Sequence, residues 1–245
     1  MTTTENHEAL IRLKLHGMAN CYKGILELPL HNQPEGHELL SHLADAEKQQ
    51  RQVHRTAQLL SQAKLRFNAV LEQIECSTAR NLTKQQLVTL ADCSFIEKAQ
   101  NILVTASTGC GKTYLICAIG HRACILGYKT LYLNMNRFAE KIMQSKLDGS
   151  FLKILSQVEK IKLLILDDFG LQQPDQNVKL ALLQILEDRY GLKSVIIASQ
   201  LPVSAWYEHI NEPTLADAIM DRLSANTHRI ELKGPSLRQK KQEEK

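Results

Sequence analysis

The sequence predicts an α/β protein in which a parallel sheet, covered by helices, follows an all-helical N-terminal region. Three observations support this fold class. Up to about residue 98 the apolar residues recur at the spacing of helix faces. Beyond that point short, nearly unbroken apolar runs alternate with helical patterns, which is typical of strands buried on both faces of a parallel sheet. The sequence TASTGCGKT joins the first of these runs to the next helix, and it ends as a phosphate-binding loop does.

The change of pattern also predicts how the chain is organised. We expect a helical N-terminal domain over residues 1–98, a sheet-containing core over residues 99–234 and a polar tail over residues 235–245. The length of 245 residues suits one large domain or a core domain with an appendage. A hydrophobic content of 44% and a charged content of 23% are ordinary for a globular protein. The net charge of +4 is compatible with a polyanionic partner without requiring one.

The cysteines and the apolar runs indicate in which cellular compartment the protein is expected. No run near the N-terminus has the form of a signal peptide, and none elsewhere approaches the ~20 apolar residues that span a membrane. The six cysteines contain no C-x-x-C pair, which favours free thiols in a reducing environment. We therefore expect a cytoplasmic protein without membrane contact.

Several helices are expected in the N-terminal region. A helical face runs through residues 7–28, and Gly17 is expected to interrupt it. Residues 38–67 are expected to form two helices, the second of them long. Two short helices are expected within residues 83–99, with Thr83 as a cap.

Five strands are expected in the core, each a short apolar run between turn or helix patterns. Their expected ranges are 101–105, 129–134, 162–168, 194–199 and 228–232. Helices are expected from residue 112 through 127 and over residues 136–144, 177–190, 202–210 and 214–226.

The loop after the first strand is the main candidate for a nucleotide site. Gly109 and Gly111 let the backbone N–H groups converge on phosphate oxygens, and the start of the helix adds a partial positive charge. Lys112 would reach the β- and γ-phosphates of ATP, and the Thr113 hydroxyl would ligate Mg²⁺. Ala106 stands where the usual pattern has its first glycine, and its methyl group would matter only if φ were positive there. The alternative is a glycine turn that binds no ligand.

Two acidic residues end the third strand. Asp167 would hold Mg²⁺, and Asp168 would orient and polarise the attacking water. Because the carboxyl ends of neighbouring parallel strands meet at one edge of the sheet, both would lie beside the phosphates. The alternative is that the two acids only solvate a strand end. The residues expected to bind the nucleotide are therefore Ala106, Ser107, Thr108, Gly109, Cys110, Gly111, Lys112, Thr113 and Asp167.

Three further residues are candidates for contact with the γ-phosphate. Gln200 follows the fourth strand, where it could sense phosphate or position water, and the alternative is a loop glutamine without a role. Arg222 could reach the nucleotide of a neighbouring subunit as an arginine finger, or it could pair with a nearby acid such as Asp221. Arg238 in the tail could contact phosphate or simply be solvated.

A stripe of basic residues marks the long N-terminal helix. Its members are Lys48, Arg51, Arg55, Lys64 and Arg66, and acidic residues are few around them. Such a stripe could track the phosphate backbone of duplex DNA. A solvated helix face would have the same composition, so both explanations stay open.

Seven sequence blocks are spread along nearly the whole chain, and the last four are much more specific than a phosphate loop. They are RLKLHGMA, TGCGKTYL, LLILDDFGL, ILEDRYG, ASQLPVSAWYEHI, PTLADAIMDRL and HRIELKGPSLR. Together they resemble the IstB-like transposition ATPases of insertion sequences, AAA+ proteins related to the DnaC helicase loaders. The resemblance implies a helical DNA-binding domain followed by an AAA+ P-loop NTPase core. It also implies that the strand before Gln200 lies between those of the phosphate loop and Asp167, and it places Arg222 at the arginine-finger position.

From this resemblance we expect an ATPase that uses ATP and Mg²⁺ and binds double-stranded DNA. It would form homo-oligomers promoted by ATP and DNA, and recruit or activate the transposase encoded by the same element. Asp168 stands where many AAA+ proteins carry glutamate, and its shorter side chain suggests slow hydrolysis. A DnaC-like replicative helicase loader is the main alternative. A small-molecule phosphotransferase and a non-hydrolysing scaffold also stay open, although no acceptor motif indicates the former.

Overall fold

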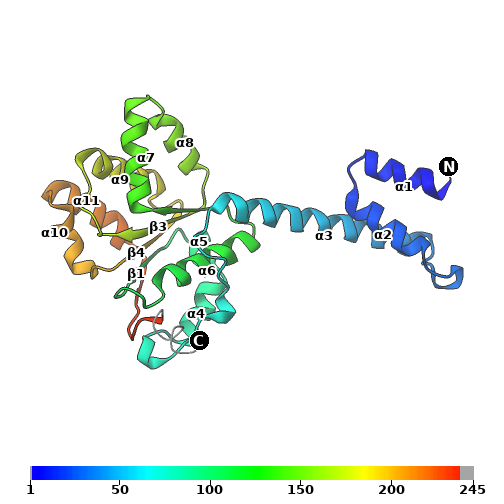
Figure 1. Ribbon diagram of the computed structural model, residues 1–245, viewed down its shortest axis with the longest axis horizontal. Coiled ribbons are helices and arrows are strands. Elements are labelled where there is room, and N and C mark those ends of the chain that lie inside the picture. Colours follow the sequence, from blue (N-terminus) through cyan, green and yellow to red (C-terminus); the bar gives the residue numbers. More distant parts are fainter. Residues whose placement is uncertain (1, 238–245) are drawn as a thin grey trace. The chain divides into compact units, whose positions relative to one another are not determined.

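A computed structural model describes residues 2–237 of the chain (Figure 1). The packing divides the chain between Gln58 and Leu59 into two compact units. Within residues 2–237 no helix combines the length and the apolar character needed to cross a membrane.

The first unit is built from α1 (Thr3–Arg12), α2 (His16–Leu26) and the first part of α3 (Gly36–Ala63). The interruption expected at Gly17 lies slightly earlier, at Lys14, which has a φ of 59°. Gly17 has a different role, because a Cβ there would lie 2.5 Å from the carbonyl oxygen of Ala46. The buried carboxylate of Glu47 accepts from the amide of Gly17 at 2.8 Å and so fixes the start of α2 against α3.

The helix α3 corrects one prediction. Residues 38–67 were expected to form two helices, but a single helix runs from Gly36 to Ala63. No glycine or proline interrupts residues 37–63, so nothing in the local sequence breaks the backbone hydrogen bonds. The helix ends at Lys64, which has a φ of 52°. The following residues form only the short turns η2 (Leu71–Gln73) and η3 (Thr78–Arg80) before the next helix.

The segment after α3 packs with the sheet. Leu82, Leu90 and Phe95 are buried in the same cluster as the helix that follows the phosphate loop. The helices here are α4 (Lys84–Ala91) and α5 (Ser94–Glu97), and the hydroxyl of Thr83 caps α4 as predicted. The sequence pattern thus changes near residue 98, whereas the packing changes near residue 58.

Five strands form one parallel sheet in the order β2-β3-β4-β1-β5, which confirms the predicted fold class. They are β1 (Asn101–Thr105), β2 (Thr130–Asn134), β3 (Leu163–Phe169), β4 (Ser194–Ser199) and β5 (Thr227–Glu231). Every residue of β1 and β4 is buried, which explains their unbroken apolar character. The register pairs Thr105 with Ser199 and Asn134 with Asp167, so the carboxyl ends of four strands align at one edge.

The helices of the core cover both faces of the sheet (Figure 1). They are α6 (Lys112–Ile125), α7 (Met135–Leu147), α8 (Phe151–Glu159), α9 (Gln176–Arg189), α10 (Trp206–Ile210) and α11 (Pro213–Ser224), with the turn η4 (Val203–Ala205) before α10. All were expected except α8, although Phe151, Ile154 and Val158 carry the spacing of a helix face.

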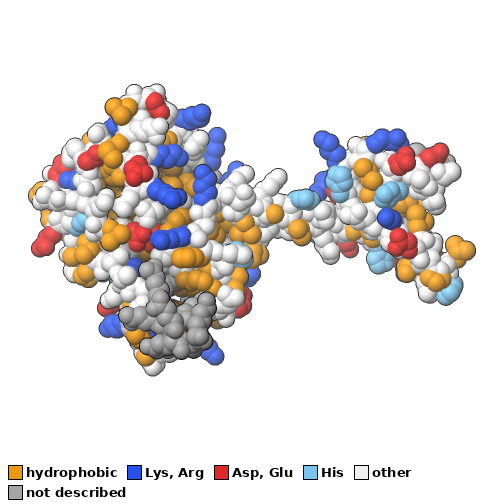
Figure 2. Space-filling model, viewed as in Figure 1, with side chains coloured by type: hydrophobic (Ala, Val, Ile, Leu, Met, Phe, Trp, Pro, Cys, Tyr) orange, Lys and Arg blue, Asp and Glu red, His pale blue; other side chains and the backbone are white. Residues whose placement is uncertain are grey.

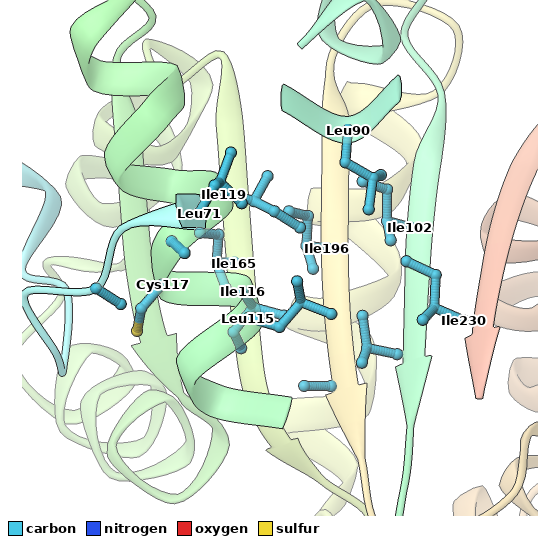
Figure 3. Close-up of a cluster of buried hydrophobic side chains, with 14 of the residues drawn as sticks. Leu71, Leu90, Ile102, Leu115, Ile116, Cys117, Ile119, Ile165, Ile196 and Ile230 are labelled. Carbon is cyan, nitrogen blue, oxygen red and sulfur yellow. The ribbon is translucent and has the colours of Figure 1, made fainter. Parts of the chain in front are cut away.

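Two apolar clusters form the core of the sheet-containing unit. One joins α6 and residues 69–96 to the face that carries Ile102, Ile165 and Ile196 (Figure 3). In the other cluster, the helices from α7 through α11 pack on the opposite face, which carries Leu103 and Ile197. Neighbouring strand residues therefore point to opposite clusters, as the pleat requires.

A buried arginine fixes the amino ends of two central strands. Arg189, at the end of α9, is 2% exposed and donates to the carbonyl oxygens of Ile161, Lys162 and Ser194 at 3.0, 3.0 and 2.7 Å. Burial lowers its pKa to about 10. This arginine stands in the block ILEDRYG, so that block has a structural explanation.

Candidate nucleotide site

The candidate site lies at the carboxyl edge of the sheet. Because β4 separates β3 from β1, the phosphate loop after β1, the acids that end β3 and Gln200 after β4 are brought together. The strand before Gln200, β4, lies between β1 and β3, as the family resemblance implied. The order of the strands thus gathers residues that are far apart in the sequence.

The backbone of the phosphate loop has the expected glycine geometry. Gly109 and Gly111 have φ values of 85° and 88°, in the left-handed region that favours glycine. Gly111 directly precedes α6, so the loop opens onto a helix start. Ala106 is absent from the described residues with positive φ, and its amide donates to the carbonyl oxygen of Ser199 at 3.2 Å. Because φ is not positive at Ala106, its methyl group does not strain the loop.

The lysine of the loop is buried against the loop itself. Lys112 is 6% exposed, and its Nζ donates to the carbonyl oxygens of Ala106 at 2.8 Å and Ser107 at 3.1 Å. The ammonium group is thus held at the phosphate-binding turn by backbone dipoles.

Asp167 is a fully buried carboxylate. The hydroxyl of Tyr132 donates to its Oδ2 at 2.7 Å, and the amide of Asp168 donates to its Oδ1 at 2.9 Å. Both of these donors are neutral. A divalent cation would compensate the charge of a buried carboxylate held in this way, so Asp167 fits a role as a Mg²⁺ ligand. Thr113, half-buried in the first turn of α6, supplies the second expected oxygen.

Asp168 occupies a constrained position. Its φ is 60°, and its Oδ2 accepts from Nδ2 of Asn134 at 2.7 Å. Nη1 of Arg66 lies 3.6 Å from the same oxygen. Burial raises the pKa of Asp168, and the neighbouring charge of Asp167 acts in the same direction. Asn134 ends β2 at the same edge of the sheet. The alignment of the carboxyl ends of parallel strands, which predicted the place of the two acids, could have predicted the place of Asn134 as well.

Gln200 is hydrogen-bonded to the phosphate loop. The hydroxyl of Thr108 donates to its Oε1 at 2.7 Å. The residue after β4 and the middle of the loop are therefore in direct contact.

The C-terminal segment and Arg80 also contact the phosphate loop, and neither contact was expected. The amide of Leu237 donates to the carbonyl oxygen of Gly109 at 3.0 Å, and a Cβ at position 109 would lie 2.1 Å from the hydroxyl of Ser236. Nη2 of Arg80 donates to the carbonyl oxygen of Cys110 at 2.9 Å. Only the fold brings these residues together. Arg238, a candidate phosphate contact, lies outside the described residues.

Arg222 lies away from the nucleotide site of its own chain. Its carbonyl oxygen accepts from Nδ2 of Asn101, the first residue of β1, at the edge of the sheet opposite the phosphate loop. Its guanidinium pairs with Glu187 at 2.8 Å and with Asp221, and lies 5.2 Å from the ring centre of Tyr190. The local ion pair that sequence analysis left open is therefore present, and contact with a nucleotide requires a second chain.

The five basic residues of the expected DNA stripe fall in different units. Lys48, Arg51 and Arg55 line an open groove of about 430 Å³ on the first unit, whereas Lys64 and Arg66 belong to the second. Nε of Arg51 donates to Glu47 at 2.7 Å, so part of its charge is neutralised. Exposed Lys and Arg side chains are visible on both units in Figure 2.

A parallel sheet with a glycine-rich loop between its first strand and a helix is the arrangement of P-loop proteins, and solved structures share this fold. The DnaC helicase loader has a TM-score of 0.57 and 20% identity, over 70% of this chain and 100% of the loader. AMPPCP-bound DnaA from Aquifex aeolicus has a TM-score of 0.59 and 20% identity, over 74% of this chain and 56% of the DnaA chain. At this identity the likeness concerns the fold alone.

Sequence comparison gives the family. Residues 8–245 match the family described as IstB-like ATP binding protein, and the chain belongs to that family. A putative insertion sequence ATP-binding protein, y4pL of Sinorhizobium fredii, is 39% identical over 95% of this chain and 96% of its own length. The putative ATP-binding protein of insertion sequence IS1162 from Pseudomonas fluorescens is 38% identical, over 83% and 89% of the two chains.

Proposed function

We propose that the protein is an ATP-dependent transposition helper. It hydrolyses ATP slowly, assembles as a homo-oligomer on target duplex DNA, and recruits or activates the transposase encoded by the same element. The observation that carries this proposal is the full-length similarity to insertion sequence ATP-binding proteins, together with a phosphate loop, two acids and Gln200 at one sheet edge.

Each residue of the site has a chemical task in this proposal. Lys112 leaves the loop carbonyls and binds the β- and γ-phosphates of ATP, while the amides of the loop bind phosphate oxygens. Thr113 and Asp167 hold the Mg²⁺, which neutralises phosphate charge when bound. Asp168 accepts the proton of the attacking water, and Gln200 links the γ-phosphate to the loop through Thr108.

Assembly completes the site. The charge that develops on the γ-phosphoryl group needs a further cation, and Arg222 lies at the opposite edge of the sheet from the chain's own loop. A neighbouring subunit can present this arginine only after it exchanges Glu187 and Asp221 for the nucleotide. Hydrolysis would therefore depend on oligomer formation, which suits a protein that acts as a switch on DNA.

The DNA contact is assigned to the groove of the first unit. Lys48 and Arg55 are exposed there, and neither has an ion pair within the described residues. Both side chains can reach phosphates of any duplex, so binding is expected to be independent of sequence and sensitive to salt.

The test measures ATP hydrolysis with and without duplex DNA, with Lys112→Ala as the inactive reference. DNA-stimulated turnover and ATP-dependent assembly, seen by electron microscopy with a non-hydrolysable analogue, are expected. A rate of ATP hydrolysis that does not change when DNA is added would favour a phosphotransferase or another ATPase. ATP binding without any hydrolysis would favour a scaffold. Co-purification with the transposase rather than with a replicative helicase separates the proposal from a helicase loader.

A further inference from the structure

The guanidinium of Arg80 binds the backbone of the phosphate loop. Its Nη2 donates to the carbonyl oxygen of Cys110 at 2.9 Å, and its Nη1 donates to the carbonyl oxygen of Glu75 at 3.2 Å. Nη2 also lies 3.1 Å from the place that a Cβ of Gly111 would occupy. Among residues 2–237 no carboxylate lies within ion-pair distance of Arg80, so backbone carbonyl oxygens are its partners there.

The bond to Cys110 fixes the direction of an amide in the loop. A peptide unit is planar and trans, so its C=O and N–H groups point in opposite directions. The carbonyl of Cys110 and the amide of Gly111 belong to one such unit, and a donor that holds the carbonyl therefore directs the amide away from Arg80. Gly111 has a φ of 88°, in a region that glycine enters and leaves at little cost, so the direction of this amide depends on an external restraint.

The backbone of Arg80 is itself tied to the end of the sheet. Its carbonyl oxygen accepts from the amide of Lys233, two residues after β5, at 3.1 Å. Nδ2 of Asn81 donates to the carbonyl oxygen of Glu231 at 2.8 Å. The hydroxyl of Ser77 accepts from the amide of Arg80 at 3.3 Å and closes the turn η3. The guanidinium therefore projects from a fixed point and can restrain the loop that it binds.

The segment after β5 holds the neighbouring part of the loop. The amide of Leu237 donates to the carbonyl oxygen of Gly109 at 3.0 Å. The thiol of Cys110, a residue only 2% exposed, donates to the carbonyl oxygen of Gly234 at 3.1 Å. Two consecutive carbonyl groups of the loop, those of Gly109 and Cys110, are thus engaged by segments outside it.

We propose that Arg80 is a positioning residue for nucleotide binding, which orients the amide of Gly111 toward phosphate oxygens. The inference rests on the proposed nucleotide site and adds to it a residue from outside the loop. A donor that is already oriented loses less freedom when the ligand binds, so Arg80 raises affinity without touching the nucleotide. Because the amides of such a loop serve the α- and β-phosphates, ATP and ADP should depend on Arg80 to the same extent.

The experiment measures the Kd of Mg-ATP and Mg-ADP by calorimetry and kcat at saturating ATP. Arg80→Met removes the guanidinium and keeps an aliphatic stem. It should raise both Kd values about tenfold, the factor expected for one hydrogen bond to a charged group, and leave kcat unchanged. Arg80→Lys, whose ammonium can still donate to the carbonyl of Cys110, should bind both nucleotides more tightly than Arg80→Met.

Arg122→Met is the matched control. Nε of Arg122 donates to the carbonyl oxygen of Ala91 at 3.1 Å from the last turn of α6. The substitution therefore removes a bond of the same kind at the end of α6 that is remote from the phosphate loop, and both Kd values should equal those of the wild type. Urea denaturation of every variant verifies that folded proteins are compared, and if Arg80→Met does not fold, Arg80→Lys is compared with the wild type.

Unchanged affinity of Arg80→Met for both nucleotides would overturn the inference. Weaker binding of ATP alone would also overturn it, because that result indicates a contact with the γ-phosphate. So would a lower kcat at unchanged Kd, or an equal loss of affinity in Arg122→Met. If the wild type binds neither nucleotide, the proposed function fails, and the role of Arg80 fails with it.

Discussion

Nζ of Lys112 lies 2.8 Å from the carbonyl oxygen of Ala106, the residue at the unusual position of the phosphate loop. The lysine therefore depends on the backbone at position 106 and not on its side chain. We expect nucleotide binding to exchange this bond for bonds to phosphate, because the ammonium lies at the glycine turn that precedes α6.

Lys112→Ala should weaken Mg-ATP binding about tenfold or more, since a hydrogen bond to a charged group contributes ~1.5–3 kcal/mol. Isothermal titration calorimetry measures the affinity. Lys129→Ala is the control, because Lys129 is exposed just before β2, at the opposite edge of the sheet. If both variants bind Mg-ATP with equal affinity, the loop is not part of the nucleotide site.

Ala106→Gly should leave ATP affinity nearly unchanged, because φ at this position is not positive and the loop has no strain for glycine to relieve. The added freedom of the unfolded chain should lower the free energy of unfolding by about 0.5–1 kcal/mol. Urea denaturation measures the second effect and calorimetry the first. A large gain in affinity would contradict the geometry and show that the native loop is impaired.

Asp168→Asn should keep Mg-ATP bound and slow turnover by about 10²–10⁴, the usual contribution of a general base. The substitution preserves the size of the side chain, and a correctly oriented amide still accepts a bond from Asn134. Steady-state hydrolysis and calorimetry are compared on the same samples. Parallel losses of binding and turnover would instead make Asp168 a metal ligand.

Lys48→Glu combined with Arg55→Glu should weaken binding to unrelated duplexes alike. The dependence of affinity on salt should flatten by about 0.9 for each DNA phosphate that the variant no longer neutralises. Fluorescence anisotropy at several salt concentrations measures both effects. Arg51 is left in place because it pairs with the buried Glu47, which fixes the start of α2. Arg229→Glu, in the other unit, controls for net charge, and normal binding by the double variant would move the DNA site out of this groove.

Arg222→Ala should leave ATP binding by the monomer intact and cut turnover of the oligomer by about 10³–10⁵, as an arginine finger does. The decisive measurement mixes Arg222→Ala with Lys112→Ala, since a mixed interface pairs an intact loop with an intact arginine. Recovery of hydrolysis is expected at intermediate mixing ratios. If mixed oligomers form but stay inactive, Arg222 is only the local partner of Glu187 and Asp221.

The sequence predicted the strands and the phosphate loop well because their signals are local. An unbroken apolar run such as residues 163–166, and a Gly-Lys-Thr turn before a helix, have few other structures available. The break expected within residues 38–67 was wrong because modest gaps in an apolar pattern do not stop a helix that lacks glycine and proline. Gln200 could be placed at the correct edge because parallel strands align their carboxyl ends.

The contacts of the site that sequence analysis missed have no local signal. Arg66 and Arg80 reach the site from irregular segments that precede the sheet, and only the packing of residues 59–98 on the sheet brings them there. Tyr132 could be located on its strand, but the bond of its hydroxyl to Asp167 depends on the register of β2 with β3. Such contacts follow from tertiary structure and cannot be derived from spacing along the chain.

The bond from the amide of Leu237 to the carbonyl oxygen of Gly109 has a practical consequence for the handling of this protein. A variant shortened before Leu237 would lose the amide that donates to this carbonyl oxygen of the glycine turn. Shortened forms used for nucleotide titrations should therefore keep Leu237, so that the turn retains the same backbone contact.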